Sequence, residues 1–512
     1  MEESALPSIF SPDHSYYKWV ISLIVIFGTL MVVLNSTGVN IAFPKIMKNF
    51  GSNPDEIQWV VSAYMIAMAV MMPTLGRLSD ILGYKKLFLG ALFLFILASG
   101  ACSLAWSLPS LIFFRVCQGM GAGIIMPLAM VILLDIFPAS EKGLAMGIFG
   151  FGVSFGPVVG PTLAGFLTEY LSWRAVFYSN IPLGLLGLMA IYYLIPDNRQ
   201  RKNGRLDYAG LLLLTVFLVS LLLALGRGNE KGWDSLYIQS LLLVALIFFL
   251  VFIVLEKLIP EPLIDLNLYK DVNFSVGSLI GIFFGLSLLS SIFLISLFVQ
   301  DLLGYTPLEA GLLVMPGSLL MGIIMLISGR ISDWIDARIL IIMGLCCLSG
   351  SAYWMSILSL QSSYLLLTVM IASRYASLAI IWSPLIAVSL GSLSQEKVGM
   401  GAGLLNIVRQ GLGGSLGVAL AAALLVSRQQ AHIIQHISKS QLAAGTNLIP
   451  LKGFSVVGGD VLKNKMLLAD FLKGVSVRQL TVAAYQDCFF IISVFSLLAI
   501  IPALFLRKDQ TL

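Results

Sequence analysis

The sequence predicts an all-α integral membrane protein with fourteen transmembrane helices, arranged as two six-helix bundles with two helices inserted between them. Of 512 residues, 58% are apolar and 11% are charged, whereas about 25% are charged in a soluble protein. Runs of about 20 apolar residues are long enough to cross a hydrocarbon core of roughly 30 Å as helices. An internal repeat indicates the two bundles.

The chain contains fourteen such apolar runs. They cover residues 19–43, 57–75, 87–107, 109–133, 143–168, 175–195, 207–226, 236–256, 274–301, 308–328, 339–358, 364–390, 400–427 and 484–506. The first run is too long for the apolar part of a signal peptide, and it follows Glu2 and Glu3 rather than a basic stretch. We therefore expect it to remain as the first helix.

Basic residues indicate which helix ends face the cytoplasm. If the amino terminus is cytoplasmic, the inside segments hold sixteen Lys and Arg and the short outside loops hold five. A long outside segment, 428–483, holds seven more, but long segments cross membranes with little regard to charge. Both termini are therefore predicted to be cytoplasmic. The net charge of +5 follows from this anchoring and requires no nucleic-acid partner.

Two stretches repeat each other: GRLSDILGYKK (Gly76–Lys86) and GRISDWIDAR (Gly329–Arg338). Each follows a helix predicted to run from outside to inside. We expect one bundle over 1–196, a linker and two inserted helices over 197–273, and a second bundle over 274–512 that includes the outside segment. Parallel halves of this kind are typical of transporters, whose substrate site lies near the midplane where the halves meet.

The repeated stretch contains a candidate conformational latch. Its residues are Gly76, Arg77, Asp80, Gly83 and Lys85, with Asp333 in the second copy. The glycines allow close approach and tight turning, and Asp80 can cap a backbone turn or pair with a base. A contact made in one conformation and broken in another would bias an equilibrium between two states. A tight turn with positive anchors is the alternative.

The spacing GxLxDxxGxK resembles the loop motif of the major facilitator superfamily. FFRVCQGMGAG (Phe113–Gly123) resembles that family's fourth-helix motif, and GVSFGPVVGPTLAGF (Gly152–Phe166) its antiporter motif. WRAVFYSNIPLG (Trp173–Gly184) and PLIDLNLYKDVNF (Pro262–Phe274) are similar to the fourteen-helix drug:proton antiporter branch, EmrB/QacA-like. The resemblance spans nearly the whole chain. It implies a proton-driven, alternating-access exporter of drugs or toxic compounds in the cell (inner or plasma) membrane.

The antiporter motif also has a direct physical interpretation. Gly152, Gly156, Gly160 and Ala164 recur every four residues, so they form one smooth helix face that a neighbouring helix can approach closely. Pro157 and Pro161 each remove a backbone donor, which loosens the helix. Static packing explains the small residues, and the family resemblance adds a hinge or sliding seam between the halves.

Three arginines lie deep in predicted spans. Arg115, Arg374 and Arg409 are each roughly 9 to 15 Å from a helix end. Such charges are expected to face a bundle interior or a watery cavity, although bonding to carbonyls of a neighbouring helix is the alternative. The candidate cavity residues that could add hydrogen bonds are Asn35, Asn40, Tyr64, Gln118 and Asn406.

The middle of each predicted span lacks an acid, and Asn35 stands where the resembling branch commonly has one. A buried cation without a carboxylate is very costly, whereas guanidinium groups suit carboxylates and phosphates. We therefore expect an amphipathic substrate that is neutral or anionic. A lipid or lipid-precursor transporter is an alternative, and a non-transporting membrane scaffold or sensor is a rival of another class.

Proton coupling requires a carboxylate whose protonation changes with conformation. The candidates are Asp80, Asp135, Asp301 and Asp487. His432 and His436 have the i, i+4 spacing of a metal pair but no third ligand in a suitable motif, so we expect a solvated helix face and no metal. Clusters at catalytic spacing are absent, so neither an enzyme nor a cofactor is predicted.

The expected partners are a small-molecule or lipid-like substrate, protons and membrane lipid. In a cell with two membranes, the outside segment 428–483 could also dock a periplasmic adaptor.

Overall fold

The computed structural model describes residues 16–52, 54–57, 59–195, 207–259, 262–443 and 477–507. These residues form helices joined by short connections, with no strand among them. In the described part of the chain, thirteen spans are long and apolar enough to cross a membrane. The predicted run 143–168 corresponds to a further helix, α7, which is not among these thirteen.

The first group of helices comes from the amino-terminal part of the chain. Its elements are α1 (Tyr17–Phe50), α2 (Pro54–Ile57), α3 (Trp59–Met71), η2 (Met72–Thr74), α4 (Leu75–Leu82), α5 (Tyr84–Ser103), α6 (Leu108–Ile136), η3 (Ala139–Glu141), α7 (Lys142–Tyr170), α8 (Ala175–Tyr178) and α9 (Asn180–Leu194). In this group α6 packs against α3 and α5, while α1 packs along α7. The centre of α6 is therefore almost entirely buried.

The second group follows two further helices. These two are α10 (Tyr208–Lys231) and α11 (Leu236–Leu258). The second group comprises η4 (Leu266–Lys270), α12 (Val272–Leu297), η5 (Phe298–Leu302), α13 (Pro307–Ser332), α14 (Ala337–Met355), α15 (Tyr364–Gly391), α16 (Val398–Asn406), η6 (Ile407–Gly414), α17 (Ser415–Ala443), α19 (Val477–Leu498) and α20 (Ile500–Ala503). Here α15 packs against α13 and α14, and α12 packs against η6 and α17.

Several helices begin where the sequence supplies a capping side chain. Ser107 starts α6 and Thr306 starts α13, each with a reciprocal capping box that satisfies amides at the helix end. Asp271 accepts a hydrogen bond from the amide of Phe274 at the start of α12. These local signals lie between the apolar runs, so they place the helix boundaries.

The structure corrects the prediction for GRLSDILGYKK. Most of this stretch is helical, because α4 continues the second span as far as Leu82. Gly83, with φ +77°, ends α4 and starts α5, and no side chain caps α5. The expectation that Asp80 caps a turn or pairs with a base stays a prediction. A positive φ is strained for residues with a Cβ, which explains glycine at this one position.

Both described ends of the predicted outside segment 428–483 are helical. α17 continues to Ala443 and α19 begins at Val477, while residues 444–476 lie outside the described residues. Since α19 begins before residue 484, Asp487 lies within the helix rather than near its end.

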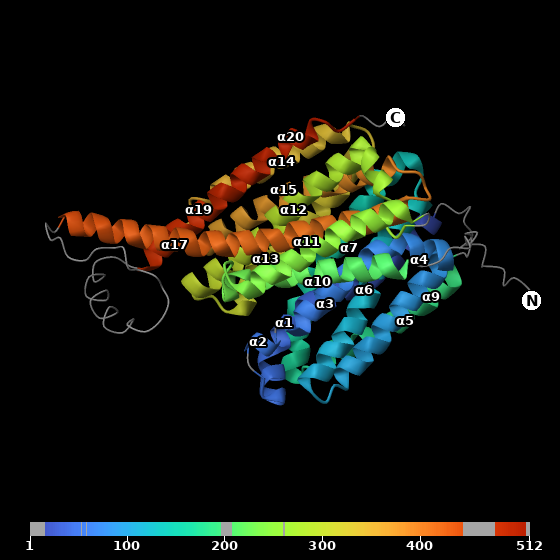
Figure 1. Ribbon diagram of the computed structural model, residues 1–512, viewed down its shortest axis with the longest axis horizontal. Coiled ribbons are helices and arrows are strands. Elements are labelled where there is room, and N and C mark those ends of the chain that lie inside the picture. The colour runs from blue at the N-terminus through green and yellow to red at the C-terminus, as the bar shows by residue number, and fades with distance from the viewer. Residues whose placement is uncertain are drawn as a thin grey trace, which may run out of the picture.

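Both described chain ends lie at one face of the molecule. Lys18 pairs with Glu141 at 2.5 Å, and a cavity of about 140 Å³ is lined by residues that include Lys142, Asp333 and Arg507. We call this the inner face. The two groups meet there and diverge toward the opposite, outer face, where α2 and the tip of α17 lie far apart (Figure 1).

The helices α10 and α11 form a hairpin beside the junction of the two groups. α11 packs mainly on α10, and α10 contacts both α3 of the first group and α17 of the second. The hairpin therefore bridges the two groups instead of belonging to the core of either one.

Candidate functional site

The two groups approach each other closely where α7 packs against α13 near the inner face. A Cβ added to Gly329 would overlap the carbonyl oxygen of Gly143, and a Cβ on Gly147 would lie 2.6 Å from the carbonyl oxygen of Met325. Only hydrogen side chains allow this backbone approach. We call this contact between residues 143–154 and 322–333 the inner seam.

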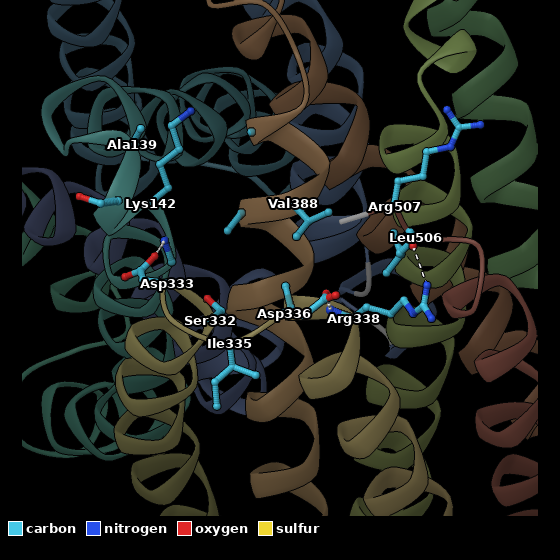
Figure 2. Close-up of a pocket in the computed structure, with 15 residues that line it drawn as sticks. Ala139, Lys142, Ser332, Asp333, Ile335, Asp336, Arg338, Val388, Leu506 and Arg507 are labelled. Atoms are coloured by element: carbon cyan, nitrogen blue, oxygen red, sulfur yellow. Dashed lines mark hydrogen bonds between the residues drawn. The ribbon is translucent and has the colours of Figure 1, made fainter. Parts of the chain in front are cut away.

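Asp333 links the two groups through the start of α7. Its Oδ1 accepts a hydrogen bond of 2.7 Å from the amide of Gly143, and its Oδ2 accepts one of 3.1 Å from Leu144. Figure 2 shows the Asp333 carboxylate directed at the turn that begins α7. A carboxylate from the second group therefore caps a helix of the first group, where the helix dipole favours negative charge.

The environment of Asp333 perturbs its ionisation. Its side chain is 4% exposed, and this burial raises the pKa of Asp333 above its ordinary value, although the amides of Gly143 and Leu144 and the charge of Arg330 oppose the increase. Arg330 also lies 3.9 Å from Glu141, which in turn pairs with Lys18. Polar contacts thus continue across the inner seam.

The first copy of the repeated stretch packs against α16. A Cβ on Gly76 would lie 2.7 Å from Cβ of Met400, and a Cβ on Gly403 would overlap the carbonyl oxygen of Met72. Arg77 and Asp80 both take part in interactions, and Lys85 lies 5.5 Å from the ring of Tyr192 on α9. The two copies of the repeated stretch therefore lie at two contacts between the groups.

The antiporter-motif glycines face α1 of their own group. Added Cβ atoms at Gly152 and Gly156 would overlap Ile26 and Val33, respectively. Close helix approach is therefore confirmed, but the inner seam uses Gly143, Gly147 and nearby residues on the other side of α7. The reason is the helical period, which places residues 143, 147 and 150 opposite 152 and 156.

The remaining residues of that motif add little to the seam. A Cβ on Gly38 of α1 would lie 3.3 Å from the carbonyl oxygen of Gly160. The side chains of Pro157 and Pro161, like that of Asn40, lie outside the described residues.

Arg115 lies inside the first group with three other predicted cavity residues. Its Nε donates to the carbonyl of Val60 at 2.9 Å, and its Nη1 donates to Asn35 and, at 2.7 Å, to Gln118. The guanidinium stacks 4.0 Å from the ring centroid of Tyr64. Arg115 is fully buried, so this polar cluster joins α6 to α1 and α3.

Arg374 occupies a corresponding place on α15 in the second group. Its Nη2 donates to the hydroxyl and carbonyl of Ser287 at 2.7 and 3.1 Å, and its Nε donates to Ser291 at 2.5 Å. Nη1 reaches the carbonyl of Leu348 at 3.3 Å. Arg374 is fully buried, so it connects α15 to α12 and α14.

Replacing Arg374 with alanine should lower the free energy of unfolding by about 2 to 4 kcal/mol, because the polar groups of Ser287, Ser291 and Leu348 lose their buried donor. Thermal melting of the purified protein measures this loss. Arg338→Ala, which removes an exposed arginine at the inner face, is the control with little expected change. Normal melting of Arg374→Ala together with lost transport would show instead that this guanidinium acts on substrate.

Arg409 differs from the other two arginines because it is only partly buried. It lies in η6, a π-helical stretch, with its guanidinium 3.9 Å from the ring centroid of Trp382. Trp382 stacks on Phe284 at 5.0 Å. Nη2 donates to Asn406 at 3.1 Å, while Nε has no partner. This Nε is itself buried, and Nη2 of Arg115 also has no partner, so Arg409 is distinguished by its partly exposed side chain rather than by a free donor.

Asn406 places Arg409 at the junction of the groups. Its Nδ2 donates to the sulfur of Met130 on α6 at 3.1 Å. The predicted cavity residues thus separate into one cluster around Arg115, a second position at Arg374, and a pair at Asn406 and Arg409 beside the opposite group.

A groove of about 240 Å³ lies between α3, α10, α12 and η6. Its described lining is mostly apolar and contains no acidic residue. The lining residues used below are Trp59, Met65, Met72, Leu222, Arg227 and Gln410. Gln410 directly follows Arg409 in η6, so the groove adjoins the segment that carries the partly exposed Arg409 side chain. Such an apolar site with a few polar groups suits an amphipathic ligand.

Arg227 and Gln410 were not among the site residues predicted from the sequence. Arg227 follows a predicted span directly, where an arginine also serves as a topology anchor, and Gln410 lies beside the more conspicuous Arg409. In the structure the Arg227 guanidinium lies 4.8 Å from the ring centroid of Trp59. Only the contact between α10 and α3 reveals that Arg227 lines a groove.

The four candidate proton carriers lie in different places. Asp135 accepts a 2.5 Å hydrogen bond from Gln395 across the inner face. Asp487 lies 2.9 Å from His432 and 4.0 Å from Arg428, near the middle of α19. Asp301 is exposed in η5, and Asp80 is partly buried in α4. The structure does not bring these four carboxylates together.

Comparison with known proteins agrees with this architecture. The model of the Major Facilitator Superfamily matches residues 25–418. The chain is 31% identical over 437 residues to the multidrug export protein EmrB of Haemophilus influenzae, covering 84% of this chain and 85% of that protein. It is 33% identical over 403 residues to the riboflavin transporter RibZ of Clostridioides difficile, covering 78% and 87%.

A solved structure has the same fold. The human organic anion transporter MFSD10 aligns with a TM-score of 0.62 and 15% identity, over 95% of this chain and 99% of that one.

Proposed function

Because the chain belongs to the Major Facilitator Superfamily, in the branch that includes EmrB-like multidrug exporters, we propose that it exports amphipathic, neutral or anionic small molecules by alternating access. It is a multi-pass membrane protein of a transporter family and not an enzyme. Multidrug export is the activity printed in the names of several relatives.

The single observation that carries the substrate class is the environment of Arg409. Its side chain is partly exposed, its guanidinium stacks on Trp382, and its buried Nε has no hydrogen-bond partner. A guanidinium in an apolar surrounding recognises carboxylate or phosphate groups, and an aromatic plane holds it in position. The adjacent groove, without acidic lining among the described residues, accommodates the apolar part of the ligand.

Arg115 and Arg374 have a different role in this proposal. Each guanidinium is fully buried and bonded to neighbouring helices of its own group. We assign them to holding each bundle rigid, so that the bundles move as units. We propose that the first bundle covers residues 1–196 and the second covers residues 274–512. Residues 197–273 link them.

The described conformation corresponds to an outward-facing state in this mechanism. The inner seam is closed by Gly143, Gly329 and Asp333, whereas the outer ends of the two groups diverge (Figure 1). Opening the seam and closing the outer ends would expose the junction to the inner side. We propose that α7 also crosses the membrane, which makes fourteen spans together with the thirteen described above. We also propose that both termini lie in the cytoplasm.

Proton exchange is the proposed source of energy. Among the four candidates, Asp135 bonds across the groups to Gln395, so its contact changes when the inner face opens. Asp80 belongs to the α4–α16 contact region. These positions support coupling through the inner contacts rather than through a carboxylate at mid-depth.

The proposal is tested with purified protein in liposomes under an imposed pH gradient. Anionic and neutral amphiphiles, including lipid-like ones, should be transported, whereas dications should not. Arg409→Ala should reduce the apparent affinity for anions about tenfold or more, because one charge-assisted contact contributes roughly 1.5 to 3 kcal/mol. Neutral substrates should change less.

Matched variants separate charge from folding. Arg409→Lys keeps the charge without the planar stack and should restore part of the anion transport. Arg338→Ala should transport normally. Preferential transport of dications, or equal losses for anions and neutrals in Arg409→Ala, would contradict the proposed substrate class. No movement of any compound, in sealed liposomes that hold folded protein, would favour a scaffold or sensor.

A further inference from the structure

The α10–α11 hairpin contains two carboxylates that meet near the inner face. Asp207 is the N-cap of α10, and Glu256 lies in the last turns of α11. A Cβ added to Gly210 would overlap Oδ2 of Asp207 and lie 2.6 Å from Oε1 of Glu256. Both oxygens therefore lie over the same glycine, which leaves room for them only because it has no side chain.

One oxygen of each carboxylate is satisfied by backbone amides. Oδ1 of Asp207 accepts a 2.9 Å hydrogen bond from Gly210, and Oε2 of Glu256 accepts one of 3.2 Å from Ile264. These bonds hold both carboxylates in place. They also attach the 262–265 connection to the end of α11.

The other two oxygens are buried and lack a hydrogen-bond donor. Oδ2 of Asp207 and Oε1 of Glu256 have no partner, and Glu256 is 4% exposed. Ionised carboxylates are acceptors only, so two facing oxygens cannot satisfy each other. Two negative charges at such a place repel, and a pair of this kind retains one proton.

We propose that Asp207 and Glu256 form a proton-binding site in the inserted hairpin. A proton on either free oxygen provides the hydrogen-bond donor that both oxygens lack, and it leaves one negative charge on the pair. The ligand is a proton rather than a metal ion, because the described residues supply two free oxygens and no further oxygen ligand aimed at the same point.

Within the described ranges, no other charge neutralises this pair. In the described residues, Asp207 is the charged group that faces Glu256. Lys257 is adjacent in sequence but exposed, and Lys397 of the neighbouring connection is paired with Asp265 at 2.7 Å. Gly210 and Ile264 contribute backbone amides only. The bound proton is therefore the element that permits the two carboxylates to remain together.

Loss of the proton should loosen the inner end of the hairpin. α10 contacts helices of both groups, so separation of α10 from α11 changes the support of the groove that α10 lines through Leu222 and Arg227. The site thus makes the hairpin sensitive to pH at the inner face. This inference does not depend on the substrate or on whether transport is coupled to protons.

Infrared spectroscopy of the full-length protein in lipid nanodiscs tests the site directly. At neutral pH the wild type should show a C=O stretching band of a protonated carboxylic acid that titrates at higher pH. Glu256→Gln and Asp207→Asn should each lose this band. Glu309→Gln, which changes an exposed carboxylate at the start of α13, should retain it.

Thermal melting provides a second measurement that does not require transport. Because the folded pair retains a proton that the unfolded chain releases, wild-type stability should fall as pH rises above the ordinary carboxyl pKa of about 4, and the fall should end once the folded pair is ionised. Glu256→Gln keeps a neutral hydrogen-bonding group and should remove most of this slope. The same band and the same pH slope in Glu256→Gln would overturn the proposal. Stabilisation by sodium but not potassium, lost in Glu256→Gln, would also overturn it by showing a cation site.

Discussion

The substitution Gly329→Val should prevent the inner seam from closing and reduce transport at least tenfold. A Cβ at this position overlaps the backbone oxygen of Gly143 and lies 3.0 Å from Cα of Gly147. Backbone cannot move aside as a flexible side chain does, so α7 and α13 must separate. Overpacking of this kind costs about 1 to 3 kcal/mol or more, which is enough to shift a two-state equilibrium tenfold.

Spin-label distances across the inner face measure this separation. Labels at the exposed positions Ser140 and Ser394, in a background that replaces the exposed cysteines Cys346 and Cys347, should move farther apart in Gly329→Val. Gly350→Val is the matched control, because an added side chain there meets no atom within 4 Å. An unchanged distance in Gly329→Val would contradict the assignment of this seam as the inner gate.

The substitution Asp333→Ala should also favour the open inner face, for a different reason. The amides of Gly143 and Leu144 lose their acceptor, and an unsatisfied buried donor costs about 1 to 3 kcal/mol. Water can satisfy these amides once the seam opens, so the loss applies mainly to the closed state. The open population should rise about tenfold or more, with a corresponding fall in transport.

The adjacent residue Asp336 provides the control for Asp333→Ala. It accepts a 2.9 Å hydrogen bond from the amide of Arg338 and caps α14 within its own group. Asp336→Ala should therefore reduce stability by about 1 kcal/mol without changing the distances across the seam. If both variants open the inner face equally, general destabilisation rather than the cap is responsible.

The acidity of Asp333 adds a pH dependence with a defined sign. Burial raises the pKa of Asp333 in the closed seam. In an open seam the carboxyl is hydrated and has its ordinary pKa of about 3.9. Closure of the seam is therefore most favourable at a pH below the ordinary pKa of Asp333. It becomes less favourable as the pH rises through the raised pKa that Asp333 has in the closed seam. The spin-label distances should show this trend in the wild type and lose it in Asp333→Ala.

Much of the architecture could be predicted from local sequence. The apolar runs identify the spans because a hydrocarbon core accepts only long, internally bonded helices. The repeated GRxSD stretches predicted two bundles and a latch, and in the structure each copy lies at a contact between the two groups. Helix ends were less accurate: α4 continues to Leu82 and α19 begins at Val477, since polar residues beyond the apolar run are compatible with helix when neighbouring helices pack against them.

The candidate site could be predicted only in part. Arg115, Arg374 and Arg409 are equivalent in sequence, as single charges in apolar helices. Their surroundings differ because Arg115 and Arg374 are directed at helices of their own group, while Arg409 is partly exposed beside the junction. Direction and neighbours depend on the rotation of each helix in the bundle, and spacing along one helix does not specify that rotation.

By itself, the sequence determined that this chain is a helical membrane transporter, because the length, apolarity and small-residue spacing of helices are properties of contiguous segments. The tertiary structure alone decided which glycines form the inner seam, which arginine lies partly exposed beside the junction of the two groups, and that Asp207 and Glu256 meet over Gly210. These features join residues that are distant in sequence, so they exist only after the helices have packed.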